Sequence, residues 1–310
     1  MAKAQTNAPS IMNKNGVSHA IQRNIDKVSY LFLLPMALFF TFFVLAPMVM
    51  GIFTSFFHYT MSDFSFSGLA NYTRVFKDPV FLRSLWNTFV IVIVSVPLVV
   101  IFSLWVGSVL TDKNSGVTSL FRGIFYLPVV MGTVPVVVVW KWIFNAYYGI
   151  LNFIMKAMGT MPQNMRFDWL GEKSTAIWCI LTILFTTSIG QPIVLYIAAL
   201  GNVDKSIIEA AEVDGASKLR TFWQVKWPAI LPTTLYIVVI TTINSFQCFA
   251  LIQLLTSGGP SYTTSTVMYY LYEQAFTYYD YGYANTMGVI LAVVIALISS
   301  LQFKVMKSDS

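Results

Sequence analysis

The stretch YLFLLPMALFFTFFVLAPMVMGIFTSFF, residues 30–57, contains no Asp, Glu, Lys or Arg and decides the solvent of this protein. A helix needs about 20 apolar residues to cross a bilayer, so this stretch is long enough to span one. A cleaved secretory signal has a shorter apolar core and ends in a small-residue cleavage site, which is absent here. Pro35 and Pro47 predict a span that is kinked, tilted or longer than the lipid is thick.

The rest of the composition agrees with a lipid solvent. Of the 310 residues, 56% are hydrophobic and 10% are charged, whereas a soluble domain carries roughly 25% charged residues. A net charge of +6 suggests nucleic acid only in a soluble protein. In a membrane protein the basic residues collect in cytoplasmic loops, so we expect a bilayer and no nucleic acid as partner.

Apolar runs recur along the chain and predict an all-α integral membrane protein with about six transmembrane helices. A polar, basic cytoplasmic arm occupies residues 1–28, the membrane domain 29–306 and a cytoplasmic tail 307–310. The predicted spans cover about 29–57, 87–110, 123–144, 174–200, 229–255 and 284–303. Residues 150–158 have helical apolar spacing and predict a short helix on the membrane surface.

The distribution of basic residues predicts the orientation. With the N-terminus inside, the inner segments carry twelve lysines and arginines and the outer segments carry six. This bias, with an even number of spans, favours both termini in the cytoplasm.

Residues typical of an enzyme are missing from the pattern. Cys179 and Cys248 lie in apolar runs, which favours buried free thiols over a disulfide or metal site. His19 and His58 are far apart, and the sequence contains no Gly-Lys pair and hence no P-loop. We therefore expect no catalytic residue, no metal and no cofactor on this chain, and ATP-driven work requires a partner ATPase.

The longest charged stretch, residues 201–232, predicts a helical hairpin between the fourth and fifth spans. Ser206 and Glu209 match a capping box and place a helix start at Ser206. Gly215 suits the end of that helix, and Ser217 suits the cap of a second one. We expect this second helix to end before the Trp227-Pro228 pair.

Two interpretations of this hairpin are open from the residues alone. The small side chains of Ala210 and Ala211 give the first helix a smooth surface, from which its acidic side chains project. Such a helix suits docking into a cleft of a soluble partner. Alternatively, the segment is a surface loop that rests against lipid headgroups.

The motif in this stretch resembles a known family. Glu209-Ala210-Ala211, then Gly215, Val225-x-Trp227-Pro228 and Pro232 resemble the EAA loop of binding-protein-dependent ATP-binding-cassette importers, with Val225 and Trp227 replacing two other apolar residues. In that family the loop is the coupling helix that docks into the ATPase. The resemblance implies that coupling rests on Glu209, Ala210, Ala211, Asp214 and Gly215.

Further motifs narrow the resemblance to permeases of the maltose and glycerol-3-phosphate type. They are Phe66-x-Gly68-Leu69-x-Asn71-Tyr72, Gly149-Ile150-Leu151-Asn152, and Leu254-Leu255-Thr256-x-Gly258-Gly259-Pro260. The resemblance implies a pore subunit of a bacterial sugar importer in the cytoplasmic membrane. Its partners would be a second homologous permease, two ATPase subunits that hold ATP and Mg, and an extracytoplasmic solute-binding protein.

Polar residues of the fifth span suggest where the solute passes. Polar side chains within spans usually face a bundle interior or a watery cavity. Asn244, Gln247 and Cys248 would share one helix face, and Phe246 and Phe249 would stack on sugar rings. The substrate pathway predicted with the help of the resemblance is Asn244, Ser245, Phe246, Gln247, Cys248 and Phe249.

Other interpretations remain for these residues and for the chain. The span 5 polar residues also suit hydrogen bonding between helices. Gln191 and Tyr196 are weaker pathway candidates, and Pro192 predicts a kink. The tyrosines of residues 262–283 suit an interfacial belt or ordinary packing more than a face for a binding protein. A self-sufficient secondary sugar carrier is the alternative function, although inverted repeats and intramembrane ion ligands are not evident.

Overall fold

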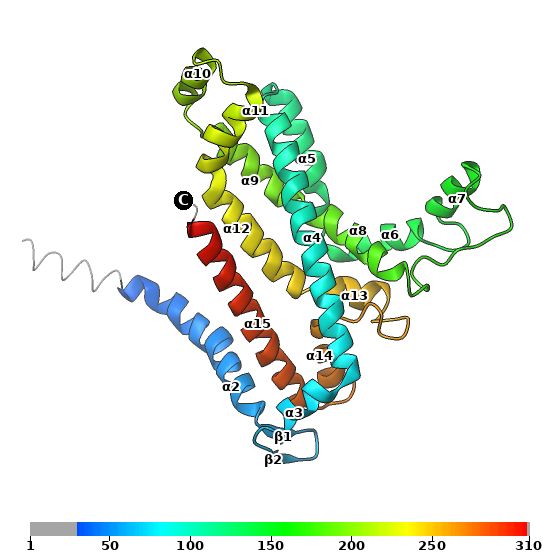
Figure 1. Ribbon diagram of the computed structural model, residues 1–310. Helices are drawn as coiled ribbons and strands as arrows, with labels where there is room; N and C mark the ends of the chain where they lie inside the picture. The colour runs from blue at the N-terminus through cyan, green and yellow to red at the C-terminus, as the bar shows by residue number, and fades with distance from the viewer. Residues whose placement is uncertain (1–29, 309–310) are drawn as a thin grey trace, which may run out of the picture. The chain divides into compact units, whose positions relative to one another are not determined.

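A computed structural model describes residues 30–308, so the predicted arm, residues 1–28, lies outside the described residues. The chain divides into two units, residues 1–53 and 54–310. The first contains a helix over Tyr30–Thr54 that includes a π-helical segment, Thr41–Leu45, and α2, Ala46–Thr54 (Figure 1). The π segment directly precedes Pro47, whose missing N–H interrupts regular α-helical bonding.

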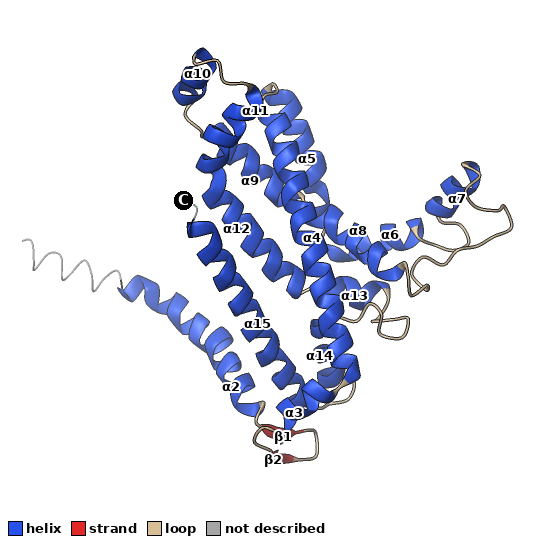
Figure 2. Ribbon diagram, in the orientation of Figure 1, coloured by secondary structure: helices blue, strands red, loops and turns tan. Residues whose placement is uncertain are grey.

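The second unit is helical apart from one short hairpin, as far as the described residues go (Figure 2). Strands β1, Phe57–Tyr59, and β2, Phe64–Phe66, pair antiparallel with Phe57 opposite Phe66. The helices are α3 Ala70–Lys77, α4 Pro79–Thr111, α5 Ser115–Met131, α6 Thr133–Ile143, α7 Ile150–Ala157, α8 Ala176–Ser188, α9 Gly190–Gly201, α10 Lys205–Val213, α11 Lys218–Thr221, the π segment η2 Phe222–Lys226, α12 Trp227–Phe246, α13 Ala250–Leu255, α14 Val267–Phe276 and α15 Tyr281–Ser308.

The helix lengths agree with about six membrane spans. Four described helices are long and apolar enough to cross a membrane, and two bent helix pairs raise the number to six. Two helices start earlier than the predicted spans because a polar side chain caps each of them. Asp78 accepts a hydrogen bond from the N–H of Val80 at the start of α4, and Asn114 accepts one from Val117 at the start of α5. The predicted loop 111–122 is therefore mostly helix.

The predicted third span, residues 123–144, is a bent pair of helices. Helices α5 and α6 meet at Gly132 and are bent by 100° from each other. Gly132 has φ +75°, a left-handed conformation that a residue with a Cβ atom adopts only with strain.

The fourth predicted span bends by 40° between α8 and α9. Pro192 lacks the N–H that would bond to the carbonyl of Ser188, so the kink predicted for this proline is confirmed close to where the helix breaks.

The helix that follows Ser217 does not end before Trp227-Pro228, contrary to the prediction. One apolar helix runs over Lys218–Phe246, through the π segment η2. The wider π turn lies just before Pro228, where the proline ring would otherwise press on the preceding turn. The second helix of the hairpin is thus continuous with the span that follows it.

Helix α4 is the central element of the second unit and packs against α8, α9, α12 and α14. It packs tightly on α9 at Gly107, where an added Cβ would sit 2.7 Å from the Cβ of the fully buried Tyr196. The polar residues on α4 pair across these contacts: Ser95 Oγ lies 2.9 Å from Ser245 Oγ, and Asn87 donates to the carbonyls of Tyr262 and Ser265. Small and polar residues thus bring these helices close together, as in other helix pairs in lipid.

A polar cluster joins the ends of α3, α4, α14 and α15. Asp78 accepts hydrogen bonds from the hydroxyls of Tyr270 at 2.6 Å and Tyr283 at 2.7 Å. Arg74 contacts Asp280 at 2.6 Å and lies 3.9 Å from the centre of the Tyr283 ring. These two tyrosines therefore serve packing, which is the interpretation favoured for the aromatic segment.

Gly107→Ala is expected to destabilise the protein by about 1–3 kcal/mol, because the added methyl overlaps the immobile Tyr196 side chain. Gly123→Ala in α5 is the matched control, since its Cβ meets nothing within 4 Å. The control should gain up to about 1 kcal/mol from helix propensity. Thermal unfolding of the purified protein in detergent measures both, and equal shifts would contradict the close packing of α4 on α9.

The Asp78 cluster predicts a dependence of stability on pH. Burial raises the pKa of Asp78, but the hydrogen bonds from Tyr270, Tyr283 and its own helix outweigh burial and leave the pKa below its ordinary value. A lowered pKa in the folded state adds stability above the unfolded pKa of about 4, and this stability is lost as the pH falls further.

Asp78→Asn is therefore expected to lower stability at pH 7 by on the order of 1 kcal/mol, allowing for solvent screening, and to flatten the decline between about pH 5 and 2. Asp63→Asn on the exposed hairpin turn is the control and should change little. Thermal unfolding over this pH range gives the comparison, and an unchanged decline in Asp78→Asn would exclude the cluster as its source.

Candidate transport pathway and coupling helix

Three helix breaks meet on one side of the second unit. They lie at Gly132 between α5 and α6, at Ile189 between α8 and α9, and at 247–249 between α12 and α13. In lipid, non-helical backbone is tolerated only where it is buried in protein or lines a water-filled cavity. Residues of all three breaks line two neighbouring cavities.

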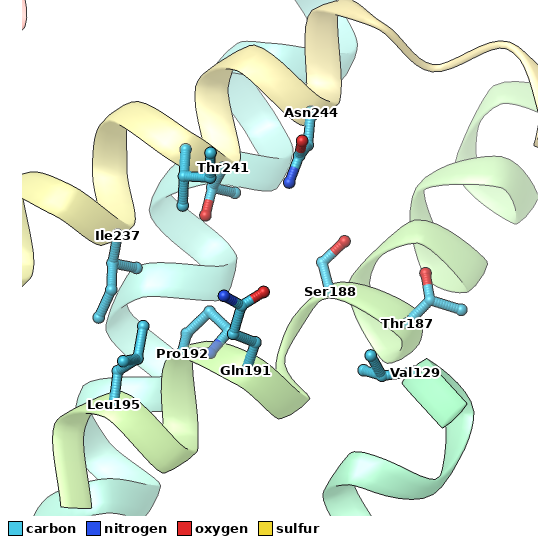
Figure 3. A pocket seen from close by; sticks show the side chains of 10 residues that line it. Val129, Thr187, Ser188, Gln191, Pro192, Leu195, Ile237, Thr241 and Asn244 are labelled. Atoms are coloured by element: carbon cyan, nitrogen blue, oxygen red, sulfur yellow. The ribbon is translucent and has the colours of Figure 1, made fainter. Parts of the chain in front are cut away.

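The first cavity has a volume of about 200 Å³ and lies between α9 and α12 (Figure 3). Figure 3 shows Asn244 of α12 facing Gln191 of α9 and Ser188 at the end of α8 across the open space. Its lining is Val129, Thr187, Ser188, Gln191, Pro192, Leu195, Ile237, Ile240, Thr241 and Asn244.

The second cavity, of about 310 Å³, shares Val129 and Thr187 with the first. Its other polar or aromatic lining comes from the breaks themselves: Thr133 after Gly132, and Gln247, Cys248 and Phe249 after α12. The two cavities adjoin along the broken helices, and together they are named the candidate path.

The structure divides the predicted pathway residues into two groups. Asn244 lines the first cavity, and Gln247, Cys248 and Phe249 line the second. Ser245 is buried in its bond to Ser95, which is the alternative interpretation of helix–helix bonding.

Phe246 is fully buried with its ring 5.7 Å from that of Phe89, so the stacking role predicted for Phe246 is wrong. The face expected to unite Asn244, Gln247 and Cys248 is also absent, because α12 ends at Phe246. Only a continued helix would have brought these three side chains onto one face.

The sequence predicted some residues of the cavity lining only weakly, or did not predict them. Gln191 was a weak candidate, and Thr187 and Ser188 were not singled out. Their signal is the Gly190-Gln191-Pro192 stretch, because a glycine and a proline inside an apolar span mark a break, and polar residues beside a break are lining candidates. Tyr196 is fully buried beside Gly107 and lines neither cavity.

The chemistry of the path is polar and uncharged. No Asp, Glu, Lys or Arg is among the residues that line the two cavities. The side-chain amides of Gln191, Asn244 and Gln247 are exposed, and no hydrogen bond joins them to another described residue. An amide offers both donors and an acceptor, which matches hydroxyl groups of a neutral solute.

The predicted hairpin exists at the far end of the same helices, with a different first cap. Asp204, not Ser206, caps α10 by accepting a hydrogen bond from the N–H of Ser206 at 2.9 Å, so the predicted capping box is wrong. This hydrogen bond lowers the pKa of Asp204. Ser217 caps α11 through the N–H of Arg220, as predicted.

Gly215 ends α10 as the sequence predicts. Its φ is +78°, its N–H bonds to the carbonyl of Glu212, and Ala216 bonds back to Ala211. These two bonds form a Schellman motif, which requires the left-handed conformation that glycine adopts most easily.

Helix α10 is largely exposed in this chain, with only Ile208 and Ala211 half-buried. It has no buried residue, and Val213 is 87% exposed. Figure 1 shows α10 at the end of the unit, joined to α9 and α11 by short loops. An isolated nine-residue helix is marginally stable in water, so the caps at both ends and the contact with α11 matter for this helix.

Broken helices around an uncharged polar path, with an exposed helix at one end, define a membrane subunit that passes a solute. Residues 66–306 match the family described as binding-protein-dependent transport system inner membrane component. The chain belongs to this family. It is therefore a permease subunit of an ATP-binding-cassette importer and not an enzyme, and the predicted family and fold class are confirmed.

Curated relatives and solved structures agree with this assignment. The chain is 33% identical over 286 residues to the probable ABC transporter permease protein YurN of Bacillus subtilis, covering 91% of this chain and 96% of YurN. It is 30% identical over 277 residues to the multiple sugar-binding transport system permease protein MsmF of Streptococcus mutans, covering 89% and 93%. A chain of a bacterial ABC transporter that imports the acidic polysaccharide alginate has the same fold, with a TM-score of 0.79, 22% identity, and 94% and 98% covered.

Proposed function

We propose that this chain forms half of the translocation pathway of an importer for a neutral sugar or oligosaccharide. The observation that carries the proposal is the uncharged path with three unpartnered amides, Gln191, Asn244 and Gln247. Hydroxyl groups of a sugar exchange hydrogen bonds with such amides in both directions. MsmF, whose name includes multiple sugar-binding transport, supports the substrate class.

Aromatic and small residues complete the proposed site. Phe249 is half-buried at the second cavity and offers a ring face to the apolar side of a sugar. Cys248 adds a narrow apolar wall beside it. Thr187 belongs to both cavities and marks the point where the solute passes from one to the other.

The proposed assembly contains a second homologous permease, two ATPase subunits with ATP and Mg, and an extracytoplasmic binding protein. Helix α10 would dock into one ATPase through Glu209, Ala210 and Ala211, while Asp214 and Gly215 shape its end. Closure of the ATPases would then move α10 and switch the pathway between its inward- and outward-open forms. In this proposal the hairpin and both termini lie on the cytoplasmic side of a bacterial cytoplasmic membrane.

Asn244→Leu and Gln191→Leu are expected to lower sugar uptake at least about tenfold each, since each removes a hydrogen-bonding group from a water-poor path. Gln163→Leu in an exposed outer segment is the matched control and should leave uptake unchanged. Uptake of labelled sugar into cells that express the complete transporter measures all three. Normal uptake by both cavity variants would exclude this path.

Glu209→Lys is expected to abolish uptake with normal expression and membrane insertion, because a reversed charge on α10 opposes docking. Glu172→Lys makes the same charge change on an exposed outer segment and should transport normally. Pull-down from mild detergent gives the second measurement: an ATPase and a second permease should accompany the chain and be lost with Gly215→Trp. Transport by the isolated chain in liposomes without ATP would instead support the secondary-carrier alternative.

A further inference from the structure

A groove of about 670 Å³ lies on the surface between α4 and the helix that begins at Lys218. It shares no lining residue with the two cavities of the path. Its walls are apolar and aromatic. They include Ile101 and Trp105 of α4 and Leu219, Trp223 and Trp227 of the facing helix. Leu219 is 70% exposed and Trp105 is 62% exposed, so the described residues of the second unit leave this surface open.

The groove is apolar along its length and has one cation at its end. Lys218 is the only charged residue in its lining, and Trp227 lies at the opposite end of the same helix segment. Lys218 and Trp227 are nine positions apart, which corresponds to about 14 Å along a helix. An occupant that fits must carry a long apolar part and a negative group at one end.

The two other basic residues of the helix that begins at Lys218 have side-chain partners. Lys226 lies 3.9 Å from Asp112, and the Nε of Arg220 donates to Gln224 at 3.0 Å. The side chain of Lys218 has no hydrogen bond or ion pair with another described residue. Its ammonium group is therefore available to an anion at the mouth of the groove.

We propose that this groove binds one anionic phospholipid. The acyl chain lies against Trp105 and Trp223, and the phosphate of the headgroup contacts Lys218. Tryptophan and lysine favour the level where the apolar core meets the headgroups, and basic pockets between helices on the cytoplasmic side bind anionic headgroups. The choice of leaflet rests on the orientation in the proposed function. Because Lys218 begins the second helix of the hairpin, the bound lipid would stabilise the connection to α10.

Native mass spectrometry of the purified transporter, with phosphatidylglycerol and phosphatidylcholine of equal acyl chains, tests the proposal. The unaltered protein is expected to retain phosphatidylglycerol at least about fivefold better than phosphatidylcholine. Lys218→Ala should abolish this preference, and Lys218→Arg should keep it. Arg220→Ala is the matched control, because it removes the same charge two residues away from outside the groove lining and should keep the preference.

A second variant tests the groove itself. Ser108→Trp fills the space between the two helices and is expected to lower retention of both lipids, with thermal unfolding confirming that the protein is folded. Equal retention of the two lipids by the unaltered protein would overturn the proposal. Equal loss of the preference in Lys218→Ala and Arg220→Ala would also overturn it, because only general charge attraction would remain.

The lipid measurement is independent of the sugar pathway. Lipid retention is read without transport, and Asn244→Leu should retain phosphatidylglycerol normally. Failure of the lipid proposal therefore leaves the uptake results unaffected, and failure of the sugar pathway leaves the lipid result unaffected.

Discussion

The obligation to satisfy every backbone hydrogen-bonding group in lipid governs this structure. A helix meets that obligation internally, so each helix break needs another partner or water. Two breaks find partners in side-chain hydroxyls: Ser103 donates to the carbonyl of Ile189, and Thr266 donates to that of Cys248. Polar side chains beside the breaks, among them Ser188, Thr133 and Gln247, line the two cavities. The same constraint that forbids irregular backbone elsewhere thus concentrates polar chemistry along one path.

The long continuous helices connect this path to both ends of the second unit. The helix over Lys218–Phe246 begins beside the hairpin and reaches Asn244 in the first cavity. Helix α4 packs beside it, and its start is fixed by Asp78 to the ends of α14 and α15. The helix continues through the π segment η2 without interruption, so under the proposed function it would transmit a displacement of the hairpin to the first cavity.

Sequence patterns predicted local features that depend on a few neighbouring residues. Gly215 ends α10, Ser217 caps α11, and the span with Pro192 is bent, all as expected. The capping box at Ser206 was wrong because Asp204, two residues earlier, competes for the same N–H groups. The helix end expected before Pro228 was wrong because a π turn, which needs no particular sequence signal, absorbs the proline.

The sequence by itself determined the lipid solvent, the approximate number of spans, the exposed hairpin and the family, because these follow from composition, periodicity and a motif of fixed spacing. Only the tertiary structure decided which polar residues line the path. Ser245 and Phe246 lie between Asn244 and Gln247 in the chain, yet they pack against Ser95 and Phe89 while their neighbours face the cavities. The physical reason has two parts. Ser245 and Phe246 point away from Asn244 because successive side chains of a helix point in different directions. Gln247 follows the end of α12, and the place of that end depends on partners from distant parts of the chain, such as Thr266, which donates to the carbonyl of Cys248.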